Sequence, residues 1–194
     1  SEMCIRDRLL ATGAGTCLQA QEKLTQFKVR DAITVRTPIM NDSINPKGEK
    51  YADKDLLKTP VVLDLADAPF QVLSTDTAGV LSFPKAEKDH SIYLLETSLR
   101  AERFMTGKLK VTSPACWEIF INGESKMSKE NAEDSISGAS TREVNLRLEP
   151  EADYEITIKL LSGSKDKAVP TLKCELIKLS LIHISEPTRH LRIS

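Results

Sequence analysis

Short stretches in which apolar and polar residues alternate recur through this chain, and they restrict its fold more than any other feature. The clearest stretch reads WEIFING, in which Trp117, Ile119 and Ile121 fall on one face of an extended strand. Asn122 and Gly123 follow at once, and this dipeptide readily adopts the positive φ angles of a type I′ turn. The stretch therefore predicts a β-hairpin with one apolar face.

Further runs of this kind are separated by turn-forming residues. Strands are predicted at residues 32–36, 61–65, 70–73, 79–83, 92–103, 108–112, 144–148, 154–160 and 172–176. The run at 92–103 is the longest, and its apolar positions change parity midway, which predicts a bulge or bend, with a helix as the alternative. Residues 51–58 are expected to form one or two helical turns that end before Pro60.

Strands spaced by about 8–12 residues, each with an apolar face, favour two antiparallel sheets packed face to face. The succession of WEIFINGE (117–124), VNLRL (144–148) and YEITIK (154–159) resembles the jelly-roll modules of galactose-binding-like and related accessory domains. This resemblance covers residues 90–178. We therefore expect a mainly all-β chain, a jelly-roll-like antiparallel β-sandwich that follows a short helical or irregular N-terminal segment.

The two ends of the chain fit neither a helical nor a strand period. Codons can be chosen for residues 1–8 such that the complementary DNA strand, read in a shifted frame, encodes LSLIHISE at residues 179–186. We interpret residues 1–8 and 179–194 as translated sequencing-adapter DNA. The organisation predicted between them is a truncated signal peptide at 9–20, an N-terminal extension at 21–58 and a β-sandwich domain at 59–178.

The small, apolar stretch that ends at Ala20 resembles the rear half of a secretory signal peptide, with an ordinary helix start as the alternative. It predicts export of the protein. Cys17 is a candidate lipidation site within it. Cys116 and Cys174 would be able to pair in an oxidising compartment, but two cysteines do not make a disulfide scaffold, so buried free thiols are the favoured interpretation.

The charge of the chain argues against a nucleic-acid partner, because the formal net charge is −1 and no basic run carries interleaved aromatic residues. No apolar stretch reaches the roughly 18 residues of a membrane-spanning helix. His90 is the one histidine between the two ends, and there is no CxxC pair, so no zinc site is expected. Asp64, Asp67 and Asp76 lack the dense spacing of a calcium loop. No metal or cofactor is predicted.

No residue of the chain is predicted to be catalytic. A serine hydrolase needs a nucleophile, a base and an orienting acid, and the sequence has no GxSxG motif to accompany His90. Paired carboxylates would suit a glycosidase. However, Glu118 and Glu124 flank the predicted hairpin and Glu149 and Glu151 flank a proline, so all four are expected on solvated strand faces and turns.

The predicted hairpin holds the candidate binding or interface residues. Trp117 shares its face with two isoleucines and is expected in the core. Phe120 points the other way, from a face that is otherwise charged, and an exposed phenylalanine there is typical of an interface. Asn122 and Gly123 at the turn complete this candidate set.

Several fragments, taken together, resemble the N-terminal region of secreted peptidases of the prolyl oligopeptidase (dipeptidyl-peptidase-like) family of Bacteroides-type bacteria. They are KTPV at 58–61, FQVL at 70–73, DTAGV at 76–80, RFMTGKLKVTSP at 103–114 and EIFING at 118–123. The resemblance implies that a signal peptide and a β-sandwich lead into a β-propeller and an α/β-hydrolase domain. Those domains would be the partners of this one, and the catalytic triad would lie beyond Lys178. The resemblance also implies export to the periplasm or cell surface of a Gram-negative bacterium.

The function that this resemblance implies is that of a non-catalytic N-terminal β-sandwich of a secreted serine peptidase, acting in domain packing, assembly or substrate access. Two alternatives remain open from the sequence. One is a carbohydrate-binding accessory module of an exported glycan-degrading enzyme, and the other is a small surface lipoprotein.

Overall fold

The computed structural model describes residues 20–36, 44, 47–61, 69–87 and 89–179, which form twelve strands and one helix. Residues 9–19 of the predicted signal peptide, which include Cys17, lie outside these residues, as do Asp64, Asp67 and most of the strand predicted at 61–65. The elements are β1 (Ala20–Lys23), β2 (Gln26–Arg30), β3 (Ile33–Val35), α1 (Asp53–Leu57), β4 (Phe70–Ser74), β5 (Val80–Ser82), β6 (His90–Arg100), β7 (Met105–Thr112), β8 (Cys116–Ile121), β9 (Glu124–Lys129), β10 (Thr141–Leu148), β11 (Asp153–Gly163) and β12 (Thr171–Leu179).

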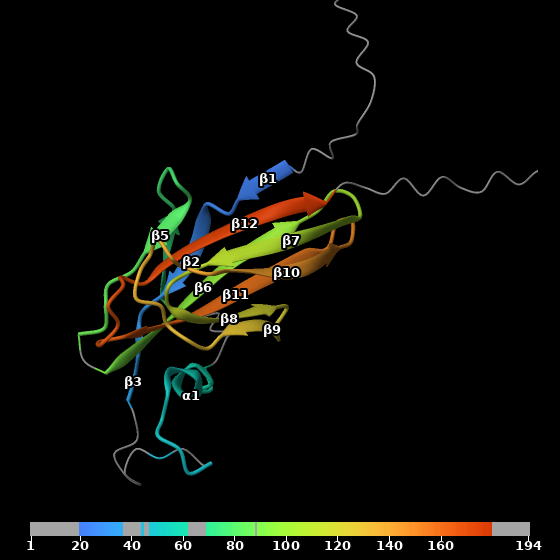
Figure 1. Ribbon diagram of the computed structural model, residues 1–194. Helices are drawn as coiled ribbons and strands as arrows, with labels where there is room; N and C mark the ends of the chain where they lie inside the picture. Colours follow the sequence, from blue (N-terminus) through green and yellow to red (C-terminus); the bar gives the residue numbers. More distant parts are fainter. Residues whose placement is uncertain (1–19, 37–43, 45–46, 62–68, 88, 180–194) are drawn as a thin grey trace, which may run out of the picture.

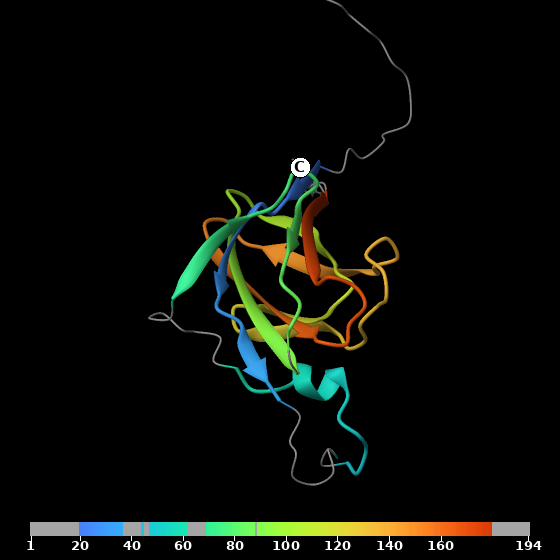
Figure 2. The same cartoon turned by 90° about the vertical axis from the view of Figure 1, so that its left-hand side faces the viewer.

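The strands form two antiparallel sheets that pack face to face (Figures 1 and 2). The five-stranded sheet has the order β1-β12-β7-β10, and β5 pairs with the same edge of β12 as β1 does. The seven-stranded sheet has the order β4-β2-β6-β11-β8-β9, and β3 pairs with β6. Strands β5 to β12 therefore form the four-strand sets 5-12-7-10 and 6-11-8-9, which is the jelly-roll arrangement. The predicted fold class is confirmed.

The main hydrophobic core lies between the two sheets. Leu109 and Val111 of β7 enter it from the five-stranded sheet, and Trp117 and Ile119 of β8 enter it from the seven-stranded sheet. All four side chains are fully buried. Burial of each aliphatic side chain of this size contributes about 1.5–3 kcal/mol. Trp117 is thus a core residue, as its position in the alternating stretch predicts.

Strand β6 corrects the bulge predicted in the run at residues 92–103. The strand pairs with β11 in one continuous register from His90 to Arg100. Its apolar residues change parity because both of its faces are buried: Tyr93 and Leu95 face the core between the sheets, whereas Ile92 and Leu94 face a second cluster on the outside. The helix alternative for this run is also wrong.

The hairpin predicted at the Asn-Gly pair is present as β8 and β9. Asn122 has a φ of 50° and Gly123 a φ of 77°, as a type I′ turn requires. A shift of register lies in this hairpin, between Ile119 and Phe120. The shift lets β9 bend without moving the apolar face of β8 out of the core.

Helix α1 covers part of the outer face of the seven-stranded sheet (Figure 2). Leu56 and Leu57 are its buried residues, and they pack in a cluster with Leu161 of β11. Lys159 of β11 donates a hydrogen bond to the carbonyl oxygen of Thr59, just after the helix. A cation there complements the carbonyl end of a helix, while burial lowers the pKa of this lysine.

The N-terminal segment contributes strands to both sheets. β1 lies in the five-stranded sheet, and β2 and β3 lie in the seven-stranded sheet, so residues of the range predicted as an N-terminal extension are built into the sandwich. β12 ends at Leu179, next to the predicted boundary at residue 178. The described part of the chain has no helix long and apolar enough to cross a membrane.

Cys116 and Cys174 are free and buried, as the favoured interpretation of the sequence predicts. Cys174 faces the core between the sheets, whereas Cys116 lies in the outer cluster beneath α1. The seven-stranded sheet therefore separates the two thiols, which cannot pair without a rearrangement of the fold.

Candidate ligand-binding groove

The outer face of the seven-stranded sheet has a covered half and an open half. Helix α1 and its neighbours cover Ile92 and Leu94 of β6. Further along the same face, β6 presents Glu96 and Ser98, and the neighbouring strand β11 presents Glu155 opposite Ser98. The change from apolar to polar side chains marks where the covering segment ends and where a ligand can reach the sheet.

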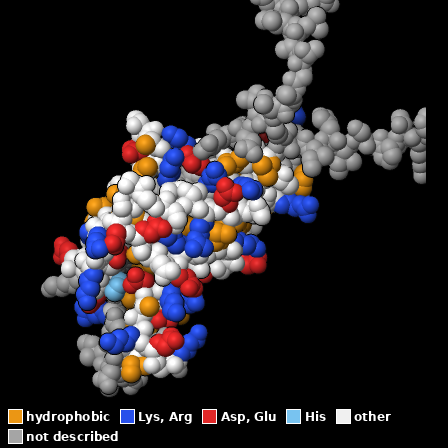
Figure 3. Space-filling model, viewed as in Figure 1, with side chains coloured by type: hydrophobic (Ala, Val, Ile, Leu, Met, Phe, Trp, Pro, Cys, Tyr) orange, Lys and Arg blue, Asp and Glu red, His pale blue; other side chains and the backbone are white. Residues whose placement is uncertain are grey.

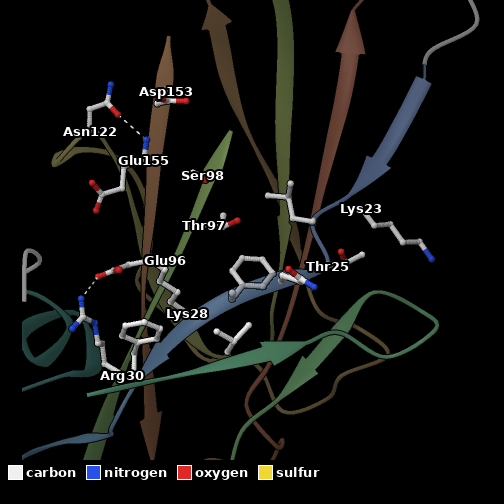
Figure 4. A pocket seen from close by; sticks show the side chains of 15 residues that line it. Lys23, Thr25, Lys28, Arg30, Glu96, Thr97, Ser98, Asn122, Asp153 and Glu155 are labelled. Carbon is white, nitrogen blue, oxygen red and sulfur yellow. Dashed lines mark hydrogen bonds and ion pairs between the residues drawn. The ribbon is translucent and has the colours of Figure 1, made fainter. Parts of the chain in front are cut away.

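A groove of about 1070 Å³ runs along this open half (Figure 4). It forms because β2 pairs with β6 at only two positions, Lys28 with Glu96 and Val29 with Leu95. One wall comes from β2 and from β4, which pairs with the other edge of β2. The other wall comes from β6, β11 and the turn between β8 and β9.

The wall from β2 and β4 combines apolar surface with positive charge. Phe70 and Val72 alternate along β4 and are 45% and 60% exposed. The Lys28 ammonium lies 5.2 Å and the Arg30 guanidinium carbon 5.7 Å from the centre of the Phe70 ring. The Arg30 guanidinium, which is nearly buried, is also paired with the Glu96 carboxylate at 3.0 Å. These contacts hold the ring in place on the rim.

The opposite wall is polar and acidic. The side-chain amide oxygen of Asn122 accepts a hydrogen bond from the backbone N–H of Glu155 at 2.9 Å. The backbone N–H of Asn122 donates to the carbonyl oxygen of Glu155 at 2.8 Å. The turn between β8 and β9 is therefore fastened to β11. Asp153, on the same strand, lies 3.7 Å from the guanidinium of Arg100. Carboxylates held in this way accept hydrogen bonds from hydroxyl groups of a ligand.

On the outer face of the five-stranded sheet, several charged side chains are paired with one another, and Figure 3 shows acidic and basic side chains interspersed there. The Lys108 ammonium lies 2.8 Å and the Lys110 ammonium 3.5 Å from the Glu143 carboxylate. Lys173 and Glu175 are paired in the same way at 2.6 Å. These pairs form a solvated ladder of opposite charges.

The structure brings one of the three predicted hairpin residues into the groove. Asn122 lines it, whereas Phe120 and Gly123 are not among its lining residues. Phe120 is half-buried on the outer face of β8, where it pairs with Thr157 of β11. Gly123 is exposed at the tip of the turn.

The residues of the wall from β2 and β4 were not predicted as site residues from the sequence. Residues 70–73 were predicted as a strand, but no role was assigned to Phe70, Lys28 or Arg30. The available signal is that Phe70, Val72 and Leu73 place apolar side chains on both faces of a five-residue strand. The local pattern does not show which of those faces another segment covers.

His90 lies in a small polar cluster beneath α1. Its Nε2 atom is 3.5 Å from the Asp53 carboxylate, which also lies 4.0 Å from the Cys116 sulfur. Burial, together with the nearby charges of Asp53 and Asp166, raises the pKa of Cys116 to about 12. The thiol is therefore protonated and is a poor nucleophile. Within the described ranges, no three histidine, cysteine or acidic side chains are grouped as metal ligands.

Three other acidic residues that the sequence offered as candidates, Glu118, Glu124 and Asp76, form hydrogen bonds or ion pairs with groups close to them in the chain. The Glu118 carboxylate accepts the Ser125 hydroxyl at 2.6 Å, and Glu124 is paired with Lys126 at 2.6 Å. The Asp76 carboxylate accepts the backbone N–H of Val80 at 2.8 Å and so closes the turn before β5.

No family model and no curated protein matches this chain. Among solved structures, a β-glucosidase from Kluyveromyces marxianus in complex with glucose has a TM-score of 0.49 and 10% identity, over 81% of this chain and 17% of that one. The PA14 sugar-binding domain of an RTX adhesin has a TM-score of 0.43 and 11% identity, over 79% of this chain and 89% of that one. A family 35 carbohydrate binding module from Clostridium thermocellum has a TM-score of 0.41 and 9% identity, over 81% of this chain and 97% of that one.

Proposed function

We propose that this chain is a non-catalytic carbohydrate-binding module and that a stretch of polysaccharide lies in the groove between β2 and β6. The observation that carries the proposal is the exposed ring of Phe70 on one wall, opposite the polar groups of Asn122 and Glu155 on the other. A sugar ring has apolar C–H faces and a rim of hydroxyl groups. An aromatic ring suits the faces, and carboxylate and amide groups suit the rim.

The shape of the groove supports a polymer as the ligand. Its volume of about 1070 Å³ is slightly above the usual range for small-molecule pockets, and it lies on an open sheet face. A groove of this kind holds several units of a chain more readily than it encloses one small molecule. The alternative role, in packing against the later domains of a secreted peptidase, stays a prediction of the sequence.

The proposal is tested by removal of the ring. Binding to a panel of soluble plant, fungal and bacterial polysaccharides is measured by affinity gel electrophoresis and then by calorimetry, for the wild type and for Phe70→Ala. We expect at least one polysaccharide to bind the wild type and to bind Phe70→Ala about tenfold more weakly, a loss of about 1.4 kcal/mol.

Phe104→Ala is the matched control. Phe104 is 42% exposed and lies 5.6 Å from the guanidinium carbon of Arg147, so its surroundings resemble those of Phe70, but it does not line the groove. The Phe104→Ala variant should bind the polysaccharide as tightly as the wild type does. Absence of binding across the panel, or an equal loss in the two variants, would overturn the proposal.

A further inference from the structure

The three basic residues that line the groove differ in the partners that they already have. Arg30 is paired with Glu96, and the Lys23 ammonium donates to the carbonyl oxygen of Thr77 at 3.3 Å. Lys28 is exposed, and within the described part of the chain no carboxylate lies within ion-pairing distance of its ammonium. Its close contact is the Phe70 ring, at 5.2 Å.

We infer that the bound polysaccharide is anionic, with a carboxylate or sulfate group placed against Lys28. This inference rests on the proposed function and specifies the ligand. A sugar unit stacked on Phe70 would cover the Lys28 ammonium and remove water from it. Such a charge is costly to desolvate unless an opposite charge replaces the water, and a neutral hydroxyl group replaces it less well.

The acidic wall directs the anion to this side of the groove. Glu155 and Asp153 lie across the groove from β4, where they would repel an anionic group and accept hydroxyl groups instead (Figure 4). The ligand would therefore lie with its charged edge towards β2 and its uncharged hydroxyl edge towards β11. Since the formal net charge of the whole chain is −1, attraction of a polyanion has to come from a local group and not from the overall charge.

Matched pairs of polymers test the inference, and they also separate the two kinds of anion. Dextran sulfate is compared with dextran, and polygalacturonate with its methyl ester, so that in each pair only the charge changes. Binding is measured at physiological ionic strength for the wild type, Lys28→Met, Lys28→Arg and Lys126→Met. Lys126 is a lysine of β9 that does not line the groove.

We expect the wild type to bind at least one charged polymer tenfold or more tightly than its neutral partner. Lys28→Met should lose that preference, Lys28→Arg should largely keep it, and Lys126→Met should match the wild type. The charged polymer that binds identifies the anion as sulfate, carboxylate or either.

Two results would overturn the inference, and they are distinct from failure of the proposed function. One is the absence of a charge preference: either a charged polymer and its neutral partner bind equally, or only neutral polysaccharides bind, while Phe70→Ala still weakens that binding. The other is a charge preference that Lys28→Met leaves unchanged. If no polysaccharide binds at all, the proposed function fails and this inference fails with it.

Discussion

Lys129 of β9 is a buried ammonium that is surrounded by oxygen atoms. Its Nζ atom lies 2.7 Å from the carbonyl oxygen of Ser113, 3.2 Å from that of Pro114 and 3.1 Å from the Glu133 carboxylate. The side chain is only 3% exposed. Because a buried charge is stable only when it is paired and hydrogen-bonded, these contacts tie the segment after β9 to the turn before β8.

Replacement of this lysine is expected to destabilise the fold strongly. Lys129→Met should lower the free energy of unfolding by about 2–3 kcal/mol, less than the 3–5 kcal/mol of a fully buried pair because Glu133 is partly exposed. Urea unfolding measures the change. Lys126→Met, on the same strand, is the control and should shift stability by no more than about 0.5 kcal/mol. A similar small shift in both variants would show that the buried ammonium contributes little.

The stability difference between the wild type and Lys129→Met should depend on pH. Burial opposes ionisation of Glu133, but hydrogen bonds from Ser140 and Lys129 outweigh it and lower the pKa of this carboxyl below its usual value of 4.5. A lowered pKa stabilises the fold above the ordinary carboxyl pKa, and that contribution disappears as the pH falls through the lowered value. The difference between the two proteins should therefore shrink on acidification below about pH 4.5. A difference that is constant down to pH 2 contradicts the pairing.

Helix α1 is an element that tertiary contacts must hold in place. It has five residues, which is too short for a helix that is stable by itself. Its stability comes from Leu56 and Leu57, which pack over the outer cluster that contains Cys116. The same short element therefore keeps a free thiol away from solvent.

Truncation of the helix contact should expose one thiol and leave the other protected. In a Cys4→Ser, Cys17→Ser background, Leu57→Ala should increase the labelling rate of Cys116 by at least tenfold, because loss of a buried leucine costs about 2–5 kcal/mol and here favours local opening. Cys174, which is in the core between the sheets, is the internal control. An equal increase at both thiols would mean that the variant unfolds globally and that α1 does not open separately.

The strand elements were predictable where alternation is clear. The runs at 70–73, 79–83, 108–112, 144–148, 154–160 and 172–176 all appear as strands. β2 was not predicted, although Phe27 and Val29 alternate with polar residues within it. A strand this short is hard to predict from the local pattern of apolar and polar residues. Its stability depends on pairing with β4 and β6, which lie far away in the sequence.

The whole molecule should unfold as a single unit, because one core joins both sheets. Trp117 is the one tryptophan of the chain and is fully buried in that core. Its fluorescence should be blue-shifted in the native state, and its urea midpoint should coincide with the midpoint from far-UV circular dichroism. Separate midpoints would indicate that the two sheets unfold independently.

The candidate groove belongs to the whole molecule, and it was only partly predictable. Asn122 was identified in the sequence because a turn signal is local. Phe70, Lys28 and Glu155 were not, because they come from three segments that approach one another only when β4, β2 and β11 join one sheet. None of these residues has a sequence neighbour that points to a site.

The sequence by itself determined where the clearly alternating strands lie, where the central hairpin turns and which of its side chains are core, because alternation and the Asn-Gly turn act within a few residues. Only the tertiary structure decided that both faces of β6 are buried, that the two buried cysteines lie on opposite sides of a sheet and that β2 leaves a groove beside β6. These features arise from pairing and covering between segments far apart in the chain. A local period reports which face of a strand is apolar, but not what comes to lie against that face.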